Sequence, residues 1–170
     1  TCAVVTVPLD RSGSVPGTID LAVRRRAATS GSATGALVYV AGGPGAPSIP
    51  RLDRLATSFA PALATRDLIV FDQRGTGLSS PLSCTPRTGN VNDARDCANA
   101  LGARRAFFSA RDSADDLDAV RAAVGVDRIA VSGVSYGGAT TYDYATRYPE
   151  HVEWLLFDSS TCRGASTRWC

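Results

Sequence analysis

The stretch from residue 129 to residue 140 constrains this chain more than any other. It reads Ile-Ala-Val-Ser-Gly-Val-Ser-Tyr-Gly-Gly-Ala-Thr, so an apolar, β-prone run enters a Gly-x-Ser-x-Gly pentapeptide and a helical pattern follows. A serine in this context sits on a sharp turn, where its hydroxyl projects from the backbone and larger residues two positions away would collide with neighbouring chain. The pattern predicts a nucleophile at Ser135, with glycine required at Gly133 and Gly137.

The residue after this serine indicates a second chemical feature, a backbone donor for an oxyanion. Tyr136 begins the expected helix, where unpaired N–H groups and the helix dipole favour a developing oxyanion. The pentapeptide alone also fits an ordinary glycine-rich turn between a strand and a helix. The strand and helix patterns on its two sides favour the catalytic interpretation.

Composition narrows the class of protein. The 170 residues are 44% hydrophobic and 20% charged, which is typical of one globular domain. A net charge of +2 is too small to indicate a nucleic-acid partner. The sequence has no run of 18 apolar residues, so no membrane span is expected.

The cysteines indicate an oxidising compartment rather than a metal site. None of the five cysteines is spaced for zinc, and a single histidine argues against a zinc site of mixed cysteine and histidine ligands. Neither a metal nor a cofactor is therefore expected. Cys84 and Cys97 bracket a polar, turn-rich loop, which a disulfide would close with a gain of about 3 kcal/mol. The odd count leaves one thiol over, or paired outside this chain.

The order of the other segments predicts an α/β architecture. Two β-prone runs at 3–8 and 18–26 are expected to form an antiparallel hairpin. Further apolar runs then alternate with helical patterns, which predicts a mostly parallel sheet with helices on both faces. Strands are expected at residues 36–41, 68–72, 129–134 and 154–158, and helices at 51–64, 94–102, 113–124 and from 137 to about 148.

Local signals set some of these boundaries. Pro61 is expected to interrupt or end the first helix, and Gly125 to stop the third. Ser113 and Asp116 have the spacing of a capping box at the start of the third helix. Three glycine-bearing loops, at 42–45, 72–77 and 133–137, follow strands and are expected at the carboxyl edge of the sheet, where ligands bind in such folds.

Taken in order, these motifs resemble the α/β-hydrolase family, and within it the branch of proline iminopeptidases and secreted actinobacterial tripeptidyl aminopeptidases. The shared motifs are Gly-Gly-Pro-Gly at 42–45, Asp-Gln-Arg-Gly-Thr-Gly at 72–77, Asp-Leu-Asp at 116–118 and the pentapeptide around Ser135. The resemblance extends to about Ser159. Ala41 departs from it, since iminopeptidases usually carry histidine before the two glycines, which argues against a strict proline specificity.

The resemblance implies roles for individual residues. Ser135 would be acylated by a peptide or small acyl substrate, and the backbone N–H groups of Gly43 and Tyr136 would form the oxyanion hole, worth about 2.7–4 kcal/mol per donor. The loop at 72–77 would brace the site. The pair Cys84 and Cys97 also fits the secreted members, so a secreted or cell-envelope location is expected.

The base that such a serine needs is not evident in this chain. His151 is its only histidine, and a helix of roughly 13 residues after Ser135 would carry the chain about 20 Å away. His151 is therefore expected to be a surface residue at the corner between a helix and a strand. Asp158 returns to the correct edge and is a possible acid, although the family places its acid after the next strand.

The resemblance implies that acid and histidine lie in a C-terminal portion, with a cap domain, that these residues do not include. Residues 1–158 are then the N-terminal part of an α/β-hydrolase core, and 159–170 a polar, cysteine-containing tail or the start of a missing region. The apolar run at 154–157 is unsuited to an exposed sheet edge, so a further polypeptide or the missing region should cover it.

Three functions remain open from the sequence. The first is a serine hydrolase of peptides, amides or esters, with an aminopeptidase favoured by the resemblance. The second is a non-catalytic protein of the same fold that binds a partner or acts as a scaffold. The third is an esterase, lactonase or acyltransferase that uses the same turn.

Overall fold

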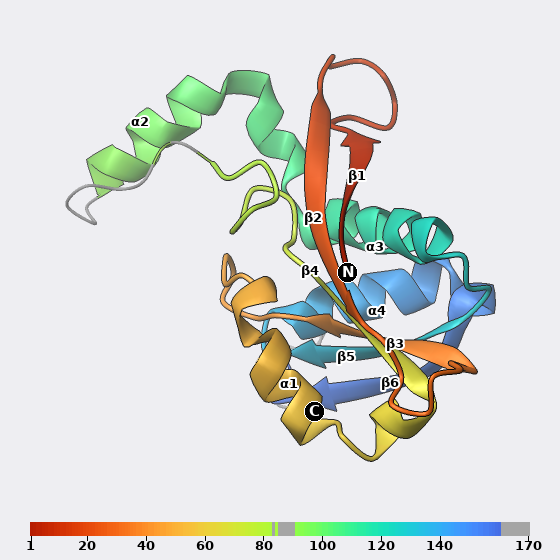
Figure 1. The fold of residues 1–170 in the computed structure, drawn as a ribbon. Coiled ribbons are helices and arrows are strands. Elements are labelled where there is room, and N and C mark those ends of the chain that lie inside the picture. The colour runs from red at the N-terminus through yellow and green to blue at the C-terminus, as the bar shows by residue number, and fades with distance from the viewer. Residues whose placement is uncertain (83, 85–90, 161–170) are drawn as a thin grey trace.

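The described part of the chain forms one mixed sheet of six strands (Figure 1). The structure is a computed structural model and describes residues 1–82, 84 and 91–160. The strands are β1 (Cys2–Pro8), β2 (Thr18–Arg26), β3 (Gly35–Val40), β4 (Arg66–Phe71), β5 (Ile129–Val134) and β6 (Val152–Asp158), in the order β1-β2-β4-β3-β5-β6. β1 pairs with β2 and β2 with β4 in antiparallel fashion, whereas the β4–β3, β3–β5 and β5–β6 pairs are parallel. The predicted hairpin and mostly parallel sheet are confirmed.

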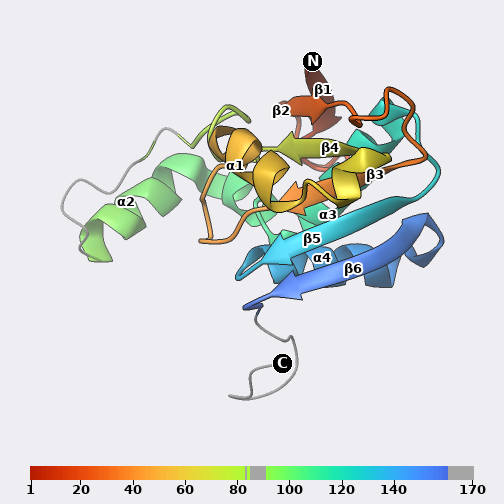
Figure 2. The ribbon, with the colours of Figure 1, turned by 60° about the horizontal axis from the view of Figure 1, so that its bottom comes forward.

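Helices cover both faces of this sheet (Figures 1 and 2). α1 (Leu52–Ser58) packs on one face, and α3 (Ala110–Val124) and α4 (Gly137–Arg147) lie together on the other. α2 (Val91–Leu101) lies away from the sheet. Short 3-10 turns are η1 (Ile49–Arg51), η2 (Ala62–Ala64), η3 (Gly102–Phe107) and η4 (Pro149–His151).

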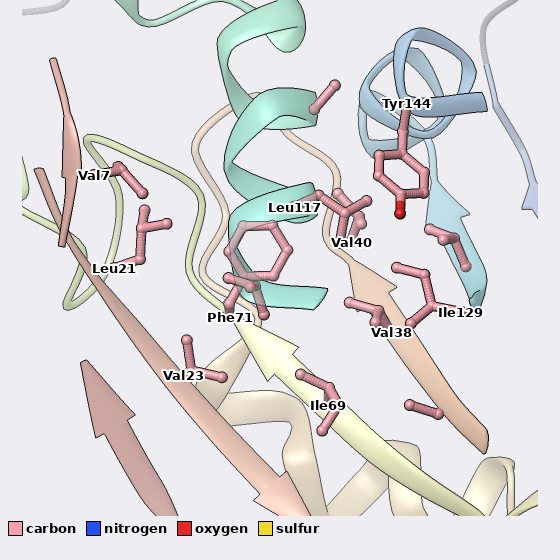
Figure 3. Close-up of a cluster of buried hydrophobic side chains, with 14 of the residues drawn as sticks. Val7, Leu21, Val23, Val38, Val40, Ile69, Phe71, Leu117, Ile129 and Tyr144 are labelled. Carbon is pink, nitrogen blue, oxygen red and sulfur yellow. The ribbon is translucent and has the colours of Figure 1, made fainter. Parts of the chain in front are cut away.

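The central strands are apolar on both alternating faces because both faces are buried. In β3, Val38 and Val40 point to the α3 and α4 side, where they share a cluster with Leu117 (Figure 3). Leu37 and Tyr39 point to the α1 side and belong to a second cluster. At about 1.5–3 kcal/mol for each large apolar side chain removed from water, these two layers hold β3 at the centre of the sheet.

Helix boundaries differ from the prediction in three places, one of them the second helix, which begins at Val91 rather than at residue 94. The expected helix at 51–64 ends at Ser58, ahead of Pro61, which disfavours helical geometry at the residue before it and was expected to interrupt or end this helix. The third helix begins one turn earlier than expected, and its capping box is Ser109 with Asp112. The prediction that Ser113 and Asp116 form its capping box was therefore wrong, since both residues are buried inside α3. The predicted stop at Gly125 is confirmed, with φ of +80° at that residue.

α2 packs only lightly on the domain and carries one cysteine of a disulfide. None of its side chains is buried, and in Figure 2 it projects beyond the arrowheads of β5 and β6. Cys84 and Cys97 are joined as expected, with their Cα atoms 5.2 Å apart. Cys2 is free and exposed, and Cys162 and Cys170 lie outside the described residues. Among the helices that the structure describes, none is long and apolar enough to cross a membrane.

β6 forms one edge of the described sheet. It pairs only with β5, and three of its large apolar side chains are exposed: Trp154, Leu156 and Phe157 are 36%, 43% and 45% accessible. Figure 2 shows no helix over β6 on the side where α1 covers β3 and β4. The described residues thus leave apolar surface uncovered at this edge, as the sequence pattern predicts.

Candidate active site

Ser135 lies on the sharp turn between the end of β5 and the start of α4. Its φ is +52°, a left-handed conformation that costs on the order of 1 kcal/mol or more for a residue with a side chain. Its N–H donates to the Asp158 carbonyl at 2.9 Å, and its own carbonyl accepts from the Gly138 N–H at 3.0 Å. The side chain is half-buried, and its Oγ makes no hydrogen bond to any described residue. The turn therefore holds the backbone and leaves the hydroxyl available.

The two glycines of the pentapeptide are required by close contacts. A Cβ on Gly133 would lie 2.3 Å from the Thr141 Oγ1. A Cβ on Gly137 would lie 2.3 Å from the Val40 carbonyl oxygen, so the start of α4 packs directly on the backbone of β3. The requirement for glycine at both positions, predicted from the sequence, is confirmed by these distances.

The loop after β3 passes beside Ser135. A Cβ on Gly42 would lie 2.8 Å from the Ser135 Cβ and 3.4 Å from its Oγ, so only glycine fits there. Gly43 has φ of +117°, a conformation that residues with side chains rarely adopt. The structure thus brings the loop that contains Gly43 together with the turn that contains Ser135.

Unpaired backbone donors are found on both of these segments. The N–H groups of Gly43 and Tyr136 donate to no acceptor within residues 1–82, 84 and 91–160. Tyr136 is the N-cap residue of α4, whose dipole places partial positive charge at that end. An oxygen that develops negative charge next to the Ser135 hydroxyl would find favourable electrostatics here.

The loop after β4 is joined to the segment after β3 through the buried carboxylate of Asp72. Its Oδ1 accepts from the N–H groups of Ser48 and Ile49 at 2.7 and 2.9 Å, and its Oδ2 accepts from the Leu78 N–H at 2.9 Å. A Cβ on Gly77 would lie 2.1 Å from the same Oδ2, so the loop closes tightly around the carboxylate. These contacts are those of a bracing loop, the role that the resemblance implies for residues 72–77.

Asp158 ends β6 at the same edge of the sheet as Ser135. It pairs with Val134 in the parallel register, and its carbonyl accepts from the Ser135 N–H. Its side chain is exposed, and Oδ1 accepts a hydrogen bond from the Ser159 hydroxyl at 2.9 Å. The expected return of this strand to the site is confirmed, but no described histidine lies there for the carboxylate to orient.

His151 lies at the opposite edge. It precedes Val152, which pairs with Ile129 at the start of β5, whereas Ser135 follows the end of that strand. Six residues at about 3.3 Å each separate the two by about 20 Å. His151 therefore does not reach Ser135, in agreement with the prediction from the sequence.

The surroundings of His151 differ from those of a plain surface residue. Its side chain is 26% exposed, its Nδ1 lies 2.6 Å from the Asp118 Oδ1, and its ring stacks on Tyr148 with centroids 5.9 Å apart. Asp118 also accepts from Arg121 at 2.7 Å and from the Tyr144 hydroxyl at 3.4 Å. Burial raises the pKa of Tyr144, and the nearby Asp118 charge adds to this. This cluster ties α3, α4 and η4 together and is structural.

Ser160 supports the turn at Ser135, although the sequence predicted it only as part of a polar tail. Ser160 is 7% exposed, and its Oγ donates to the Gly133 carbonyl at 3.1 Å, so it supports the turn from the side of β6. Only the position after β6 could have indicated this, because serine is as common in exposed tails as in buried turns. In the part of the chain that the structure describes, no group of three or more potential metal ligands occurs.

Known proteins are similar to this chain in sequence and in fold. A family profile described as alpha/beta hydrolase fold matches residues 35–167. The tripeptidyl aminopeptidase of Streptomyces lividans is 31% identical over 186 aligned residues, covering 93% of this chain and 35% of that protein. Serine protease Hip1 of Mycobacterium tuberculosis is 29% identical, with 94% and 35% covered. The crystal structure of the proline iminopeptidase of Mycobacterium smegmatis superposes with a TM-score of 0.61 at 24% identity, covering 93% of this chain and 44% of that one. The chain spans about a third of the length of the curated relatives it matches.

Proposed function

This chain belongs to the alpha/beta hydrolase fold family, and on that basis we propose that it carries the nucleophile of a serine hydrolase, with Ser135 as the residue that is acylated. The observation that carries the proposal is the state of the Ser135 side chain. It is half-buried on a left-handed turn, its hydroxyl makes no bond within the described residues, and the Gly42 backbone lies against it. Strain of this kind is retained where a site needs it.

The proposed reaction passes through an acyl-enzyme. The Ser135 Oγ attacks the substrate carbonyl carbon while its proton passes to a general base, and the carbonyl oxygen becomes an oxyanion that accepts hydrogen bonds from the Gly43 and Tyr136 N–H groups. The bond to the amine or alcohol then breaks, and the leaving group takes the proton from the base. Water, deprotonated by the same base, attacks the acyl carbon and restores the Ser135 hydroxyl with release of the acid.

The base and its acid come from outside these residues in this proposal. His151 is separated from Ser135 by the length of β5, and the Asp158 carboxylate has no described histidine partner. The exposed apolar residues of β6 mark the edge where a further segment would continue the sheet. Residues 1–158 would then be the N-terminal part of a hydrolase core, and the remainder of the triad and any cap would follow.

Peptides and other amides are the proposed substrates. Relatives named tripeptidyl aminopeptidase and serine protease align along more than nine-tenths of this chain, which favours amide over ester hydrolysis. The Cys84–Cys97 disulfide supports an extracytoplasmic location, because such bonds persist in oxidising compartments. Esters, lactones or acyl transfer remain as alternative chemistries for the same nucleophile, and a non-catalytic binding role as the alternative without chemistry.

A fluorophosphonate probe tests the proposal. The complete natural protein is treated with the probe, digested under non-reducing conditions and analysed by mass spectrometry. We expect one adduct on Ser135, none in Ser135→Ala, and normal labelling in His151→Gln, which controls for loss of the histidine in this chain. A folded, complete protein without an adduct at Ser135 would favour the binding or scaffold role.

A substrate panel then separates the chemistries. Aminoacyl and tripeptidyl amides are compared with simple esters and lactones at equal concentration. Under the proposal kcat/KM is highest for a peptide amide with a free amino terminus, whereas a preference for lactones or simple esters would move the assignment to that class. Reaction in the presence of a nucleophilic acceptor shows whether the acyl group is transferred.

A further inference from the structure

Gln73 bridges the two segments that carry the proposed oxyanion-hole donors. Its Nε2 donates to the Ala41 carbonyl at 3.0 Å, and its Oε1 accepts from the Thr140 hydroxyl at 2.9 Å. Ala41 immediately precedes the glycines of the first loop, and Thr140 lies in the first turns of α4, four residues after Tyr136. The three residues are buried, with 4% exposure for Gln73 and 0% for the other two.

The chemistry of this bridge requires an amide. A backbone carbonyl only accepts hydrogen bonds, so the nitrogen of Gln73 must face Ala41 and its oxygen must face the Thr140 hydroxyl. A carboxylate of the same shape has no donor for the carbonyl, and an apolar side chain satisfies neither group. The carboxylate would leave the Ala41 carbonyl buried without a hydrogen bond, and the apolar side chain would leave both partners so, which is unfavourable.

The segments that Gln73 joins are in direct backbone contact. The Gly137 Cα lies against the Val40 and Ala41 carbonyls, where an added Cβ would come within 2.3 and 2.7 Å. The Ala41 N–H is also held, since it donates to the Ser48 Oγ at 3.2 Å. A shift of Ala41 relative to α4 would therefore change the direction of the Gly43 N–H with respect to that of Tyr136.

We infer that Gln73, acting with Thr140, is a positioning residue that sets the separation and direction of the two proposed oxyanion-hole donors, the N–H groups of Gly43 and Tyr136. That Gln73 holds the two segments together rests on its hydrogen bonds to Ala41 and Thr140. That this affects catalysis rests on the proposed function. Oxyanion donors act within about 2.7–3.1 Å of the developing charge, so a small displacement of one of them is costly. Gln73 itself does not touch the substrate.

The expected effect falls on turnover rather than on substrate binding. Loss of the bridge leaves both donors present but misdirected, so kcat should fall by about 10- to 100-fold. KM should stay within about threefold of its original value, because an interaction made mainly in the transition state is weakened. A purely structural role would instead lower the unfolding midpoint and leave kcat of the folded fraction unchanged.

The test uses four variants of the complete natural protein. Gln73→Glu keeps the shape of the side chain and removes the donor to Ala41, and Thr140→Val removes the hydroxyl with little change in volume. Thr140→Ser restores the hydroxyl and is the matched rescue. Thr146→Val is the control on the same helix, because Thr146 is exposed and bonds only the Tyr142 carbonyl at 2.9 Å.

Two readouts are taken on each variant that folds. The first is kcat and KM for the best substrate, and the second is hydrogen–deuterium exchange of the peptide that contains residues 41–46. We expect Gln73→Glu and Thr140→Val to lose turnover and exchange faster in this peptide, while Thr140→Ser and Thr146→Val behave like the original protein. If Gln73→Glu does not fold, the comparison of Thr140→Val with Thr140→Ser decides whether the inference holds.

The outcomes separate this inference from the proposed function. Unchanged kcat and unchanged exchange in Thr140→Val would overturn the inference, even if Ser135 is labelled by fluorophosphonate. Faster exchange with unchanged kcat would overturn the catalytic part. Absence of labelling at Ser135 in the original protein would overturn the proposed function alone, and the exchange data would still show whether Gln73 holds the loop.

Discussion

Arg74 and Asp116 form a fully buried ion pair, with Nε 2.7 Å from Oδ2 and Nη2 2.6 Å from Oδ1, and both side chains are 0% exposed. The Nη1 of Arg74 also donates to the carbonyls of Leu9 and Phe107 at 2.9 and 2.8 Å. One guanidinium therefore joins the N-terminal hairpin, the loop after β4 and α3. It thereby fixes the loop at 72–77 to α3.

Replacement of Arg74 by Met should be among the most destabilising single changes in this chain. It leaves the Asp116 carboxylate buried with only Arg11 as a partner, and removal of one member of a buried pair typically costs about 3–5 kcal/mol. Urea denaturation of the two proteins measures the difference. Arg11→Gln is the control, because Arg11 bonds the same carboxylate at 2.8 Å but is 31% exposed, so its loss should cost about 1 kcal/mol or less. Similar small losses of stability in both variants would contradict the view that Arg74 is the main partner of the buried Asp116 carboxylate.

The cluster around Asp118 should make stability depend on pH in the acid range. Burial alone would raise the pKa of Asp118, but the hydrogen bonds and charges of Arg121 and His151 outweigh it, so the pKa lies below its usual value. A depressed carboxyl pKa contributes stability above the unfolded value of about 3.9, and that contribution is lost as the pH falls further.

Asp118→Asn should therefore be less stable than the original protein at pH 7, and the difference should narrow as the pH falls below about 4. Urea midpoints measured at a series of pH values between neutrality and pH 3 provide the test. Asp127→Asn removes the same charge from an exposed position just after α3 and is the control. A difference between Asp118→Asn and the original protein that stays constant down to pH 3 would exclude this explanation.

Reduction of the Cys84–Cys97 disulfide should loosen α2 without unfolding the sheet. α2 buries no side chain, so closing of this short loop, worth up to about 3 kcal/mol, is a main source of its local stability. We expect the double variant Cys84→Ser, Cys97→Ser to exchange amide hydrogens faster in residues 91–101, with little change in the global urea midpoint. Cys2→Ser controls for loss of a thiol. A fall in the global midpoint with no selective change in α2 would show that the bond supports the core instead.

The strands and the turn at Ser135 could be predicted because their signals are local. Residues 36–41 and 68–71 are apolar at consecutive positions, which favours a doubly buried strand, and glycine at two fixed positions is what the turn needs. The cap of α3 could not be predicted in the same way. Ser109 with Asp112 and Ser113 with Asp116 have the same spacing, one helical turn apart, and the choice between them is made by Arg74, which takes Asp116 from far along the chain.

Long-range contacts also explain what was missed at the site. Gln73 and Thr140 are 67 residues apart, and no pattern in the sequence connects them. His151 looks like a surface residue in its local sequence, yet Asp118 and Tyr148 enclose it once α3 and α4 pack together. Such pairings follow from the sheet order, which places β3 between β4 and β5 and cannot be read from any one segment.

Ser160 and Gly138 provide a test of how the turn is supported from the side of β6. A Cβ on Gly138 would lie 2.2 Å from the Ser160 Oγ and 2.3 Å from its Cβ, but 3.4 Å from its Cα. Gly138→Ala should therefore destabilise the protein by about 1–3 kcal/mol through overpacking, although alanine is the better helix former. Ser160→Gly alone should cost about 1 kcal/mol or more, through loss of the hydrogen bond to Gly133 and gain of backbone freedom.

The double variant should be more stable than Gly138→Ala alone, because glycine at 160 removes both atoms that the new methyl group meets and leaves the Cα at an ordinary contact distance. The favourable helix propensity of alanine, about 1 kcal/mol over glycine, is then no longer offset by a clash. Urea denaturation of the four proteins gives the interaction energy directly. Additive losses would mean that the backbone of α4 moves away from Ser160 at little cost.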